Sequence, residues 1–401
     1  MTSERIRRLR EQLDQLLSET ALEAIEREQS AFDEFAGPRR NRIVLFGARR
    51  LGRKILTGLR GVGIEPFAFS DNDPQTWGTI IDGVAVYSPE DAAKRFGTDA
   101  VFVITIWGRG SSDSMAQRRQ NLEALGCDRV ISFVPLFWKY SSTFLPHGAL
   151  DLPHRVIESA DQVKRCFDIL SDEQSKSGLV EQVAWRVRGD FDALSDPVED
   201  EIYFPEFVDS LQALETFVDC GAYDGDTALR FLARNDYQVK KIFAFEPDPD
   251  NFRALQENVA RLPKELRERI ETSRYAIGEQ KVIASFAATG TVGASFAEGS
   301  FTVECISLDE ALRHEAPTYI KMDIEAAEPA AIRGAKKLIK ENQPVVAACS
   351  YHRQDHLWTI PLLLFETSPE LAILQRQHIQ KVEDLVTYGV PYGRLLDRSE
   401  H

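Results

Sequence analysis

The chain is poor in cysteine and in long apolar runs, and both shortages narrow its class. Its five cysteines are scattered over 401 residues, and none belongs to a Cys-x-x-Cys pair. A disulfide framework or a structural zinc site is therefore not expected, and a reducing, cytoplasmic location fits. Because no run of about 18 apolar residues is present, no membrane span is expected. The first residues carry alternating charges without an apolar signal segment, from which we infer no secretion.

Basic residues are also in short supply. The chain carries 48 Lys and Arg against 63 Asp and Glu, so its formal net charge is −15. Nucleic acids and anionic membrane surfaces attract clustered basic residues, so neither is expected as the main partner. The other proportions, with 43% hydrophobic and 28% charged residues, are typical of a globular protein with two or three domains.

Hydrophobic patterning divides the chain into four parts. Residues 1–38 are expected to form a helical arm, and residues 39–140 a small Rossmann-like α/β domain. Residues 141–205 are expected to be a helical and acidic linker, in which the acid-rich stretch 190–215 predicts a solvated loop. Residues 206–401 alternate strands and helices again. The fold class is therefore α/β, with a second doubly wound sheet after the first.

The arm has one clear pattern and two interpretations. Apolar residues recur at three- and four-residue spacing from Ile6 to Leu17 and predict one helix over 4–36. Such a stripe usually packs on its own domain. The alternative is a coiled coil that forms a homodimer through the N-terminal helix.

The first α/β domain begins like a nucleotide-binding unit. A strand over 42–46 runs into Gly47-Ala48-Arg49-Arg50-Leu51-Gly52, and Asp71 follows the second strand, where a ribose-binding acid belongs. In the dinucleotide fingerprint a glycine stands at the position of Arg49, because the backbone must approach the pyrophosphate. We therefore favour a substrate-recognition or scaffolding role for this domain, with NAD binding as the alternative.

The second sheet carries a better-defined pocket. A strand ends at Asp219 and leads into a turn with Gly221 and Gly225, which we expect to let the backbone approach a ligand. Glu246 ends the next strand, 21 residues after Gly225, near the spacing of the carboxylate that binds ribose hydroxyls. Asp219 is suited to an ammonium group and Glu246 to a ribose. S-adenosylmethionine contains both groups, so we expect it to be the ligand. The alternative is that Glu246 caps the helix that follows it.

Three stretches resemble the FkbM family of S-adenosylmethionine-dependent methyltransferases, namely 217–227, 243–249 and 320–328. The resemblance extends over 203–365 and implies a class I methyltransferase fold that O-methylates hydroxyl groups of sugars, glycans or natural products. The family usually has a glycine where this chain has Ala326. With this resemblance, the residues expected to bind the cofactor are Asp219, Gly221, Ala222, Tyr223, Gly225, Asp226, Thr227, Glu246, Pro247 and Ala276.

Methyl transfer to an alcohol needs aligned reactants and a base for the hydroxyl proton. Asp323 follows the strand predicted at 319–322, Glu325 comes two residues later, and His352 follows the next strand at the same sheet edge. These three side chains are the expected catalytic residues, and an ordinary His pKa near 6.5 suits a base at neutral pH. Glu328 is expected to cap the next helix or to interact with its dipole.

No metal site is predicted, although two alternatives stay open. Asp323 and Glu325 could hold a divalent ion that acidifies the hydroxyl, or Asp323 could only orient substrate hydroxyls. His352 and His356 stand four residues apart and could form a metal pair, but no third histidine stands nearby.

The sequence thus predicts an S-adenosylmethionine-dependent O-methyltransferase for a small-molecule, sugar or glycan acceptor. A nicotinamide-dependent oxidoreductase that uses the N-terminal domain is one alternative, and the missing fingerprint glycine counts against it. The other is a non-catalytic scaffold that binds a nucleotide sugar, against which the intact Asp219, Glu246 and Asp323 count.

Overall fold

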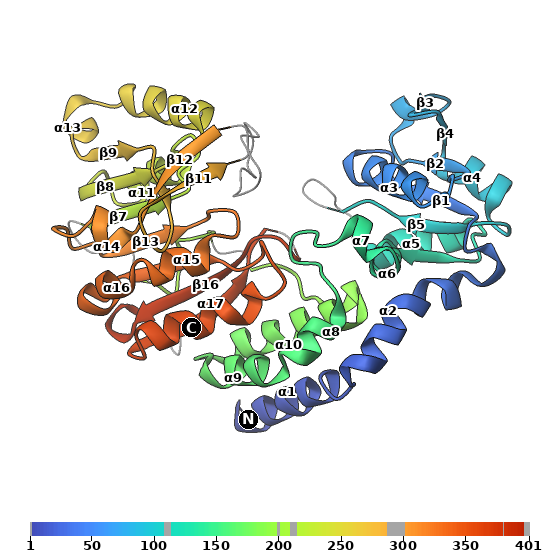
Figure 1. Cartoon of the computed structure of the whole chain (residues 1–401), viewed down its shortest axis with the longest axis horizontal. Coiled ribbons are helices and arrows are strands. Elements are labelled where there is room, and N and C mark those ends of the chain that lie inside the picture. Colours follow the sequence, from blue (N-terminus) through green and yellow to red (C-terminus); the bar gives the residue numbers. More distant parts are fainter. Residues whose placement is uncertain are drawn as a thin grey trace. The chain divides into compact units, whose positions relative to one another are not determined.

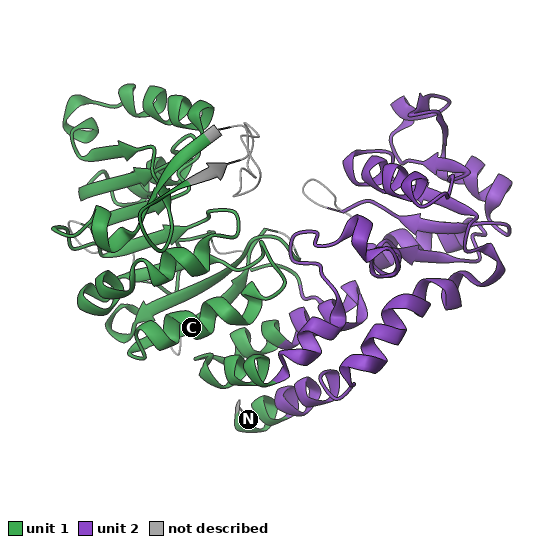
Figure 2. Ribbon diagram, in the orientation of Figure 1, with its two compact units in different colours: residues 1–7, 161–179, 196–401 green, residues 8–160, 180–195 purple. Residues whose placement is uncertain are grey.

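The computed structural model describes residues 2–107, 114–198, 201–208, 215–286, 301–379 and 381–396. The chain divides into two compact units, each made of segments that are separate in sequence (Figure 2). Unit 1 comprises Met1–Arg7, Asp161–Leu179 and Asp196–His401, and unit 2 comprises Arg8–Ala160 and Val180–Ser195. The division into four consecutive parts, 1–38, 39–140, 141–205 and 206–401, stays a prediction. No helix in the described segments is long and apolar enough to cross a membrane.

Unit 2 contains a sheet whose described strands have the order β3-β4-β2-β1-β5-β6 (Figure 1). All neighbouring pairs are parallel except β3 with β4. Every residue of β1 and β5 is buried, as their continuous apolar sequences lead one to expect in a parallel sheet. The strands are β1 Ile43–Phe46, β2 Ala68–Ser70, β3 Ile80–Ile81, β4 Val84–Tyr87, β5 Val101–Ile104 and β6 Val130–Ser132.

The helices of unit 2 fill the connections between these strands. Helix α3 joins β1 to β2, α4 joins β4 to β5, and α5 joins β5 to β6, as in a doubly wound fold. Their bounds and those of the following short helices are α3 Arg50–Gly61, α4 Pro89–Phe96, α5 Met115–Ala124, α6 Val134–Lys139, α7 Ser141–Phe144 and α8 Pro153–Glu158.

The single helix expected over 4–36 is wrong, because the structure has α1 Thr2–Leu16 and α2 Ala21–Ala36. Thr20 starts α2 with a capping box: its hydroxyl accepts from the Glu23 N–H at 3.2 Å, and the Glu23 carboxylate accepts from the Thr20 N–H at 2.8 Å. Helix α2 packs on α6 and α8 of the same unit. The apolar stripe from Ile6 to Leu17 belongs mainly to α1, and the choice between its two interpretations stays a prediction.

Unit 1 contains a larger sheet with the order β15-β16-β14-β13-β7-β8-β9 in its described strands. The strands from β14 to β9 are parallel, whereas β16 runs antiparallel to both β14 and β15. This confirms the predicted second doubly wound sheet. Its strands are β7 Glu215–Cys220, β8 Val239–Phe245, β9 Ile270–Ser273, β13 Tyr319–Met322, β14 Val345–Cys349, β15 Leu371–Gln377 and β16 Leu385–Pro391.

The strand order of this sheet reverses direction at β7, since β8 lies on one side of it and β13 on the other. The carboxyl ends of β7, β8 and β13 therefore meet at a topological switch point, where open α/β sheets bind ligands. A smaller sheet has the order β10-β12-β11, with β10 Ala276–Ile277, β11 Val282–Phe286 and β12 Phe301–Ile306. The remaining helices are α9 Ala160–Ile169, α10 Glu173–Arg188, α11 Asp226–Arg234, α12 Pro249–Ala260, α13 Lys264–Arg267, α14 Leu308–Ala311, α15 Glu328–Arg333, α16 Lys336–Asn342 and α17 His356–Thr367.

The solvated loop expected over 190–215 is wrong for residues 202–208 and for Glu215, while residues 199–200 and 209–214 lie outside the described residues. Tyr203, Phe204 and Phe207 are buried in the hydrophobic core of unit 1. Glu215 is also buried, and Arg394 pairs with it at 2.6 Å. Aromatic residues between the acids thus anchor this segment to the sheet, because their burial outweighs the solvation of the neighbouring charges.

Candidate functional site

The turn after β7 needs its two glycines for packing. Gly221 has φ +80°, and a Cβ there would lie 1.9 Å from the carbonyl oxygen of Asp323. Gly225 has φ +89°, and a Cβ there would lie 2.8 Å from a Leu255 methyl group. Both positions therefore favour glycine even without a ligand. The glycines shape the turn, and the evidence for a ligand has to come from the polar groups around it.

Asp219 lies near the end of β7, beside the positively charged side chain of Lys321 on the neighbouring strand. Its carboxylate is fully buried, and Oδ1 lies 2.9 Å from Nζ of Lys321, its direct neighbour on β13. Lys321 also donates to the carbonyl of Gly221 at 2.6 Å. Burial alone would lower the pKa of Lys321, but the nearby carboxylates outweigh it and raise this pKa. Oδ2 of Asp219 is buried without a hydrogen-bond partner among the described residues, which leaves one acceptor for a ligand donor.

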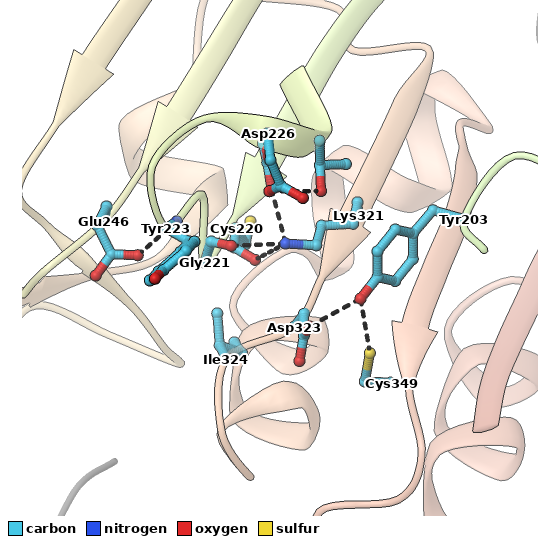
Figure 3. A network of polar contacts seen from close by, with 12 residues as sticks. Tyr203, Cys220, Gly221, Tyr223, Asp226, Glu246, Lys321, Asp323, Ile324 and Cys349 are labelled. Atoms are coloured by element: carbon cyan, nitrogen blue, oxygen red, sulfur yellow. Dashed lines mark hydrogen bonds and ion pairs between the residues drawn. The ribbon is translucent and has the colours of Figure 1, made fainter. Parts of the chain in front are cut away.

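Glu246 ties the turn after β7 to the end of β8. Its Oε2 accepts from the backbone N–H of Tyr223 at 2.8 Å (Figure 3), and its Oε1 accepts from that of Asp248 at 2.9 Å. Burial raises the pKa of Glu246 to about 7, although both N–H donors act to lower it. The alternative that Glu246 caps α12 is wrong, because Asp248 accepts the N–H groups of that helix's first turn.

The other predicted cofactor residues lie on three elements. Ala222, Tyr223 and Asp226 belong to the turn and the start of α11, where Ala222 is buried and the other two are exposed. Thr227 is buried in α11, and Pro247 follows Glu246 directly. Ala276 lies in β10, which belongs to the smaller sheet rather than to the main one. Cofactor contact by these residues stays a prediction.

The expected catalytic residues meet beyond the ends of β13 and β14. His352 Nε2 lies 3.3 Å from Asp323 Oδ1 and 3.7 Å from Glu325 Oε2. Its Nδ1 lies 2.9 Å from Glu328 Oε1. One imidazole ring is therefore surrounded by three carboxylates, which we call the His352 cluster.

Glu328 is the innermost member of the His352 cluster. It is fully buried, its Oε1 accepts from the Ile324 N–H at 2.9 Å, and its Oε2 lies 3.5 Å from His356 Nδ1. The N-cap position of α15 is Ala327, and no side chain caps this helix. The expected capping role of Glu328 is therefore wrong, while its place in the first turn suits an interaction with the helix dipole.

The charges of the cluster change the role expected for His352. Burial alone would lower the His352 pKa, but Glu328 and Asp323 outweigh it and raise this pKa well above its ordinary value. Burial would raise the Asp323 pKa, but His352 and Lys321 outweigh it and lower this pKa. The expectation of an ordinary His pKa is therefore wrong. An imidazolium at neutral pH cannot accept a hydroxyl proton.

Tyr203 is a site residue that the sequence analysis did not identify. Its hydroxyl donates to Oδ2 of Asp323 at 2.8 Å, and its ring centroid lies 5.3 Å from Nζ of Lys321 (Figure 3). Tyr351 donates to the other oxygen of the same carboxylate at 3.5 Å. Aromatic residues within the acidic stretch were the available signal for Tyr203, since solvated loops contain few of them.

The position where the FkbM family usually has glycine adopts a backbone that favours glycine. Ala326 has φ +81°, and Glu325 before it has φ +54°. Two consecutive residues with side chains in the left-handed region are strained, and each costs roughly 1–2 kcal/mol. The turn directs Glu325 and Glu328 to His352.

In unit 2, Asp71, which was predicted to bind a ribose, already accepts hydrogen bonds from backbone N–H groups of the neighbouring loops. Asp71 accepts from the N–H groups of Ala48 at 2.7 Å and of Asp73 at 2.9 Å, and it is buried. The Arg49 side chain is 82% exposed and pairs with Asp73 at 3.3 Å. Asp71 thus stabilises the turn, and nucleotide binding here stays a prediction.

The strand order, the antiparallel β16 and the acids that follow β7, β8 and β13 define a class I methyltransferase fold in unit 1. Residues 219–376 match the family described as methyltransferase FkbM domain. The chain therefore contains an FkbM methyltransferase domain, and the resemblance seen in the sequence is confirmed.

One curated relative is the hexuronic acid methyltransferase AglP of Haloferax volcanii, which is 36% identical over 101 residues. The match covers 23% of this chain and 40% of that protein, so the chain spans well under half of the relative's length. A crystal structure of methyltransferase FkbM from Methylobacillus flagellatus KT is similar over 92% of this chain and 100% of its own, with a TM-score of 0.70 and 19% identity. At this identity, the structural likeness shows the fold alone.

Proposed function

We propose that the chain is an S-adenosylmethionine-dependent O-methyltransferase that acts on a hydroxyl group of a sugar or glycan. The observation that carries the proposal is the convergence of Asp219, Glu246 and the His352 cluster at one edge of the main sheet. The FkbM domain match supports methyl transfer, and the relative named for hexuronic acid supports a sugar acceptor.

The chain's polar groups fit this cofactor. The free Oδ2 of Asp219 suits the ammonium group, and Glu246 suits the ribose hydroxyls because a carboxylate accepts two hydrogen bonds side by side. When bound, the cofactor supplies a sulfonium-activated methyl group. The rest of the reaction is alignment and deprotonation of the acceptor.

The chain's residues divide this work. Asp323 is held by Tyr203 and by His352, so it orients the acceptor hydroxyl as a hydrogen-bond acceptor. Glu325 is the better proton acceptor, because its side chain is 25% exposed and burial raises its pKa. His352 fixes the carboxylates in place and keeps the site from holding three uncompensated charges.

Two substitutions test the cofactor and the acceptor sides separately. Asp219→Asn and Glu246→Gln are expected to weaken S-adenosylmethionine binding at least tenfold in isothermal titration calorimetry. Asp323→Asn is expected to keep the wild-type affinity and to stop transfer of labelled methyl groups to uronic acids or hexoses. Glu279→Gln, which removes an exposed carboxylate paired with Arg333, is the control for lost charge. Wild-type affinity in both cofactor variants would refute the cofactor assignment.

A further inference from the structure

We propose that Asp323, Glu328 and His352 bind a divalent transition-metal ion, with Glu325 at the edge of the same site. One ligand atom from each of the three residues lies within 4.8 Å of the others. Metal–ligand bonds of about 2.0–2.2 Å place two ligands of one ion at most about 4.4 Å apart. Three ligands spread evenly around one ion lie at most about 3.8 Å apart, so side-chain shifts of up to about 1 Å close the site.

Three buried atoms of this cluster have charged neighbours but no well-directed hydrogen bond. His352 Nδ1 and Nε2 and Glu328 Oε2 lack a hydrogen bond to any described residue, although carboxylates stand nearby. The two side chains are only 7% and 0% exposed, so water gives little compensation. Buried polar atoms of this kind are normally hydrogen-bonded or bound to a metal. Asp323 and Glu328 face opposite nitrogens of the ring, so an ion bound at one nitrogen replaces the proton there, and the carboxylate on the other side has to turn toward the ion.

The net negative charge of the His352 cluster also favours a bound cation. Three carboxylates surround one ring, so the four side chains have a net charge of −2 with a protonated ring and −3 with the neutral ring that binds a metal ion. No Lys or Arg takes part in the cluster's ion pairs among the described residues, and the nearby Lys321 pairs with Asp219. A divalent ion balances this excess, because a buried negative charge needs a cation close to it.

The ligand types indicate the class of metal. Imidazole suits transition-metal ions such as Fe²⁺, Ni²⁺, Cu²⁺ and Zn²⁺, and carboxylates also suit Mn²⁺, whereas Mg²⁺ and Ca²⁺ prefer sites made of oxygen ligands alone. Three protein ligands leave positions open, as in catalytic metal sites rather than structural ones. The site should therefore prefer Mn²⁺ over Mg²⁺.

The role of this ion rests on the proposed function. An open position lets the ion bind the acceptor hydroxyl and lower its pKa. The acceptor O–H bond then breaks and its proton goes to Glu325, while the new O–CH₃ bond forms. The bond from the methyl carbon to sulfur breaks, and its electron pair stays on the sulfur.

Metal binding is tested directly on the full chain after dialysis against EDTA. Mn²⁺ is titrated in while electron paramagnetic resonance follows the free ion, and one saturable site per chain is expected. His352→Asn and Glu328→Gln are each expected to weaken binding at least tenfold. The control is His154→Asn, because His154 lies 2.9 Å from one carboxylate, that of Glu28, without a second acid.

The outcomes separate this proposal from the proposed function. No saturable Mn²⁺ site, wild-type affinity in both cluster variants, or equal affinity for Mg²⁺ would overturn the metal site. Glu328→Gln is nearly isosteric, so it gives an answer even where His352→Asn does not fold. Saturable Mn²⁺ binding without any methyl transfer would support the site and refute the transferase. Full transfer by the EDTA-treated chain would overturn the ion's role in the reaction.

Discussion

Glu246 makes the stability of unit 1 depend on pH in a direction opposite to that of most carboxylates. Its pKa rises from an ordinary 4.5 to about 7 in the fold, mainly because it is buried. At 1.36 kcal/mol per pKa unit, this shift corresponds to about 3 kcal/mol. The folded state binds more protons than the unfolded state between these two values. The contribution of Glu246 should therefore be fully present below pH 4.5 and lost by about pH 7.

Glu246→Gln isolates this contribution. The amide oxygen can still accept one of the two N–H groups, from Tyr223 or Asp248, and the other stays unpaired at a cost of about 1–3 kcal/mol. At pH 5 the variant should therefore be less stable than the wild type. At pH 8 the two should be nearly equal, because the wild type then carries the cost of a buried charge.

The assay is urea unfolding followed by circular dichroism at pH 5, 6, 7 and 8, with the wild type and variant compared at each pH. Other titrating groups cancel in this difference, which should fall by about 3 kcal/mol across the range. Glu257→Gln, an exposed carboxylate on α12, is the matched control for the lost charge and should give a flat difference. A difference for Glu246→Gln that does not change between pH 5 and pH 8 would refute the reasoning.

Three further substitutions test the site by urea unfolding. Gly221→Ala should lower the free energy of unfolding by clearly more than the roughly 1–2 kcal/mol expected for the control Gly63→Ala. Gly63 has nearly the same φ but open space around it, so equal losses would contradict the argument that Gly221 is needed for packing. Asp219→Ala should lower the free energy of unfolding by about 3–5 kcal/mol, because it leaves Lys321 buried without its counter-ion. Adding Lys321→Met should restore most of this stability, and no recovery would mean that the unpaired lysine is not the cause of the loss. Ala326→Gly should stabilise the fold by about 1 kcal/mol, because it relieves a φ of +81°, and a loss would show that the turn is not strained.

The parallel strands of unit 1 were the most predictable part of the chain. The strands predicted at 319–322 and 345–349 have those bounds in the structure, because each is a short run of mainly apolar residues that ends at polar ones. The arm was less predictable, since its apolar spacing continues through the break before Thr20. The capping box there was readable, as Thr20 and Glu23 have the spacing that defines one.

The candidate site could be predicted only in part, for a physical reason. Asp323 and His352 follow adjacent strands, so topology alone brings them to one edge. Tyr203 comes from a segment 120 residues earlier in the chain, and periodicity gives no hint of such a contact. The raised pKa of His352 could not be read from the sequence either, because it depends on burial together with Asp323 and Glu328.

The carboxylate of Asp219 at the end of β7 and the carboxylates of the His352 cluster beyond β13 differ in how their negative charge is balanced. Asp219 and Lys321 are direct neighbours on β7 and β13, so that acid carries its own cation within the sheet. Among the described residues, the carboxylates beyond β13 form ion pairs with the ring of His352 and, for Glu328, with His356, and Lys321 next to them already pairs with Asp219. A sulfonium cofactor is cationic too, but it loses that charge when the methyl group leaves. A cluster balanced by the cofactor alone would therefore become uncompensated after each transfer, whereas a bound divalent ion would offset two of the three negative charges before and after the reaction.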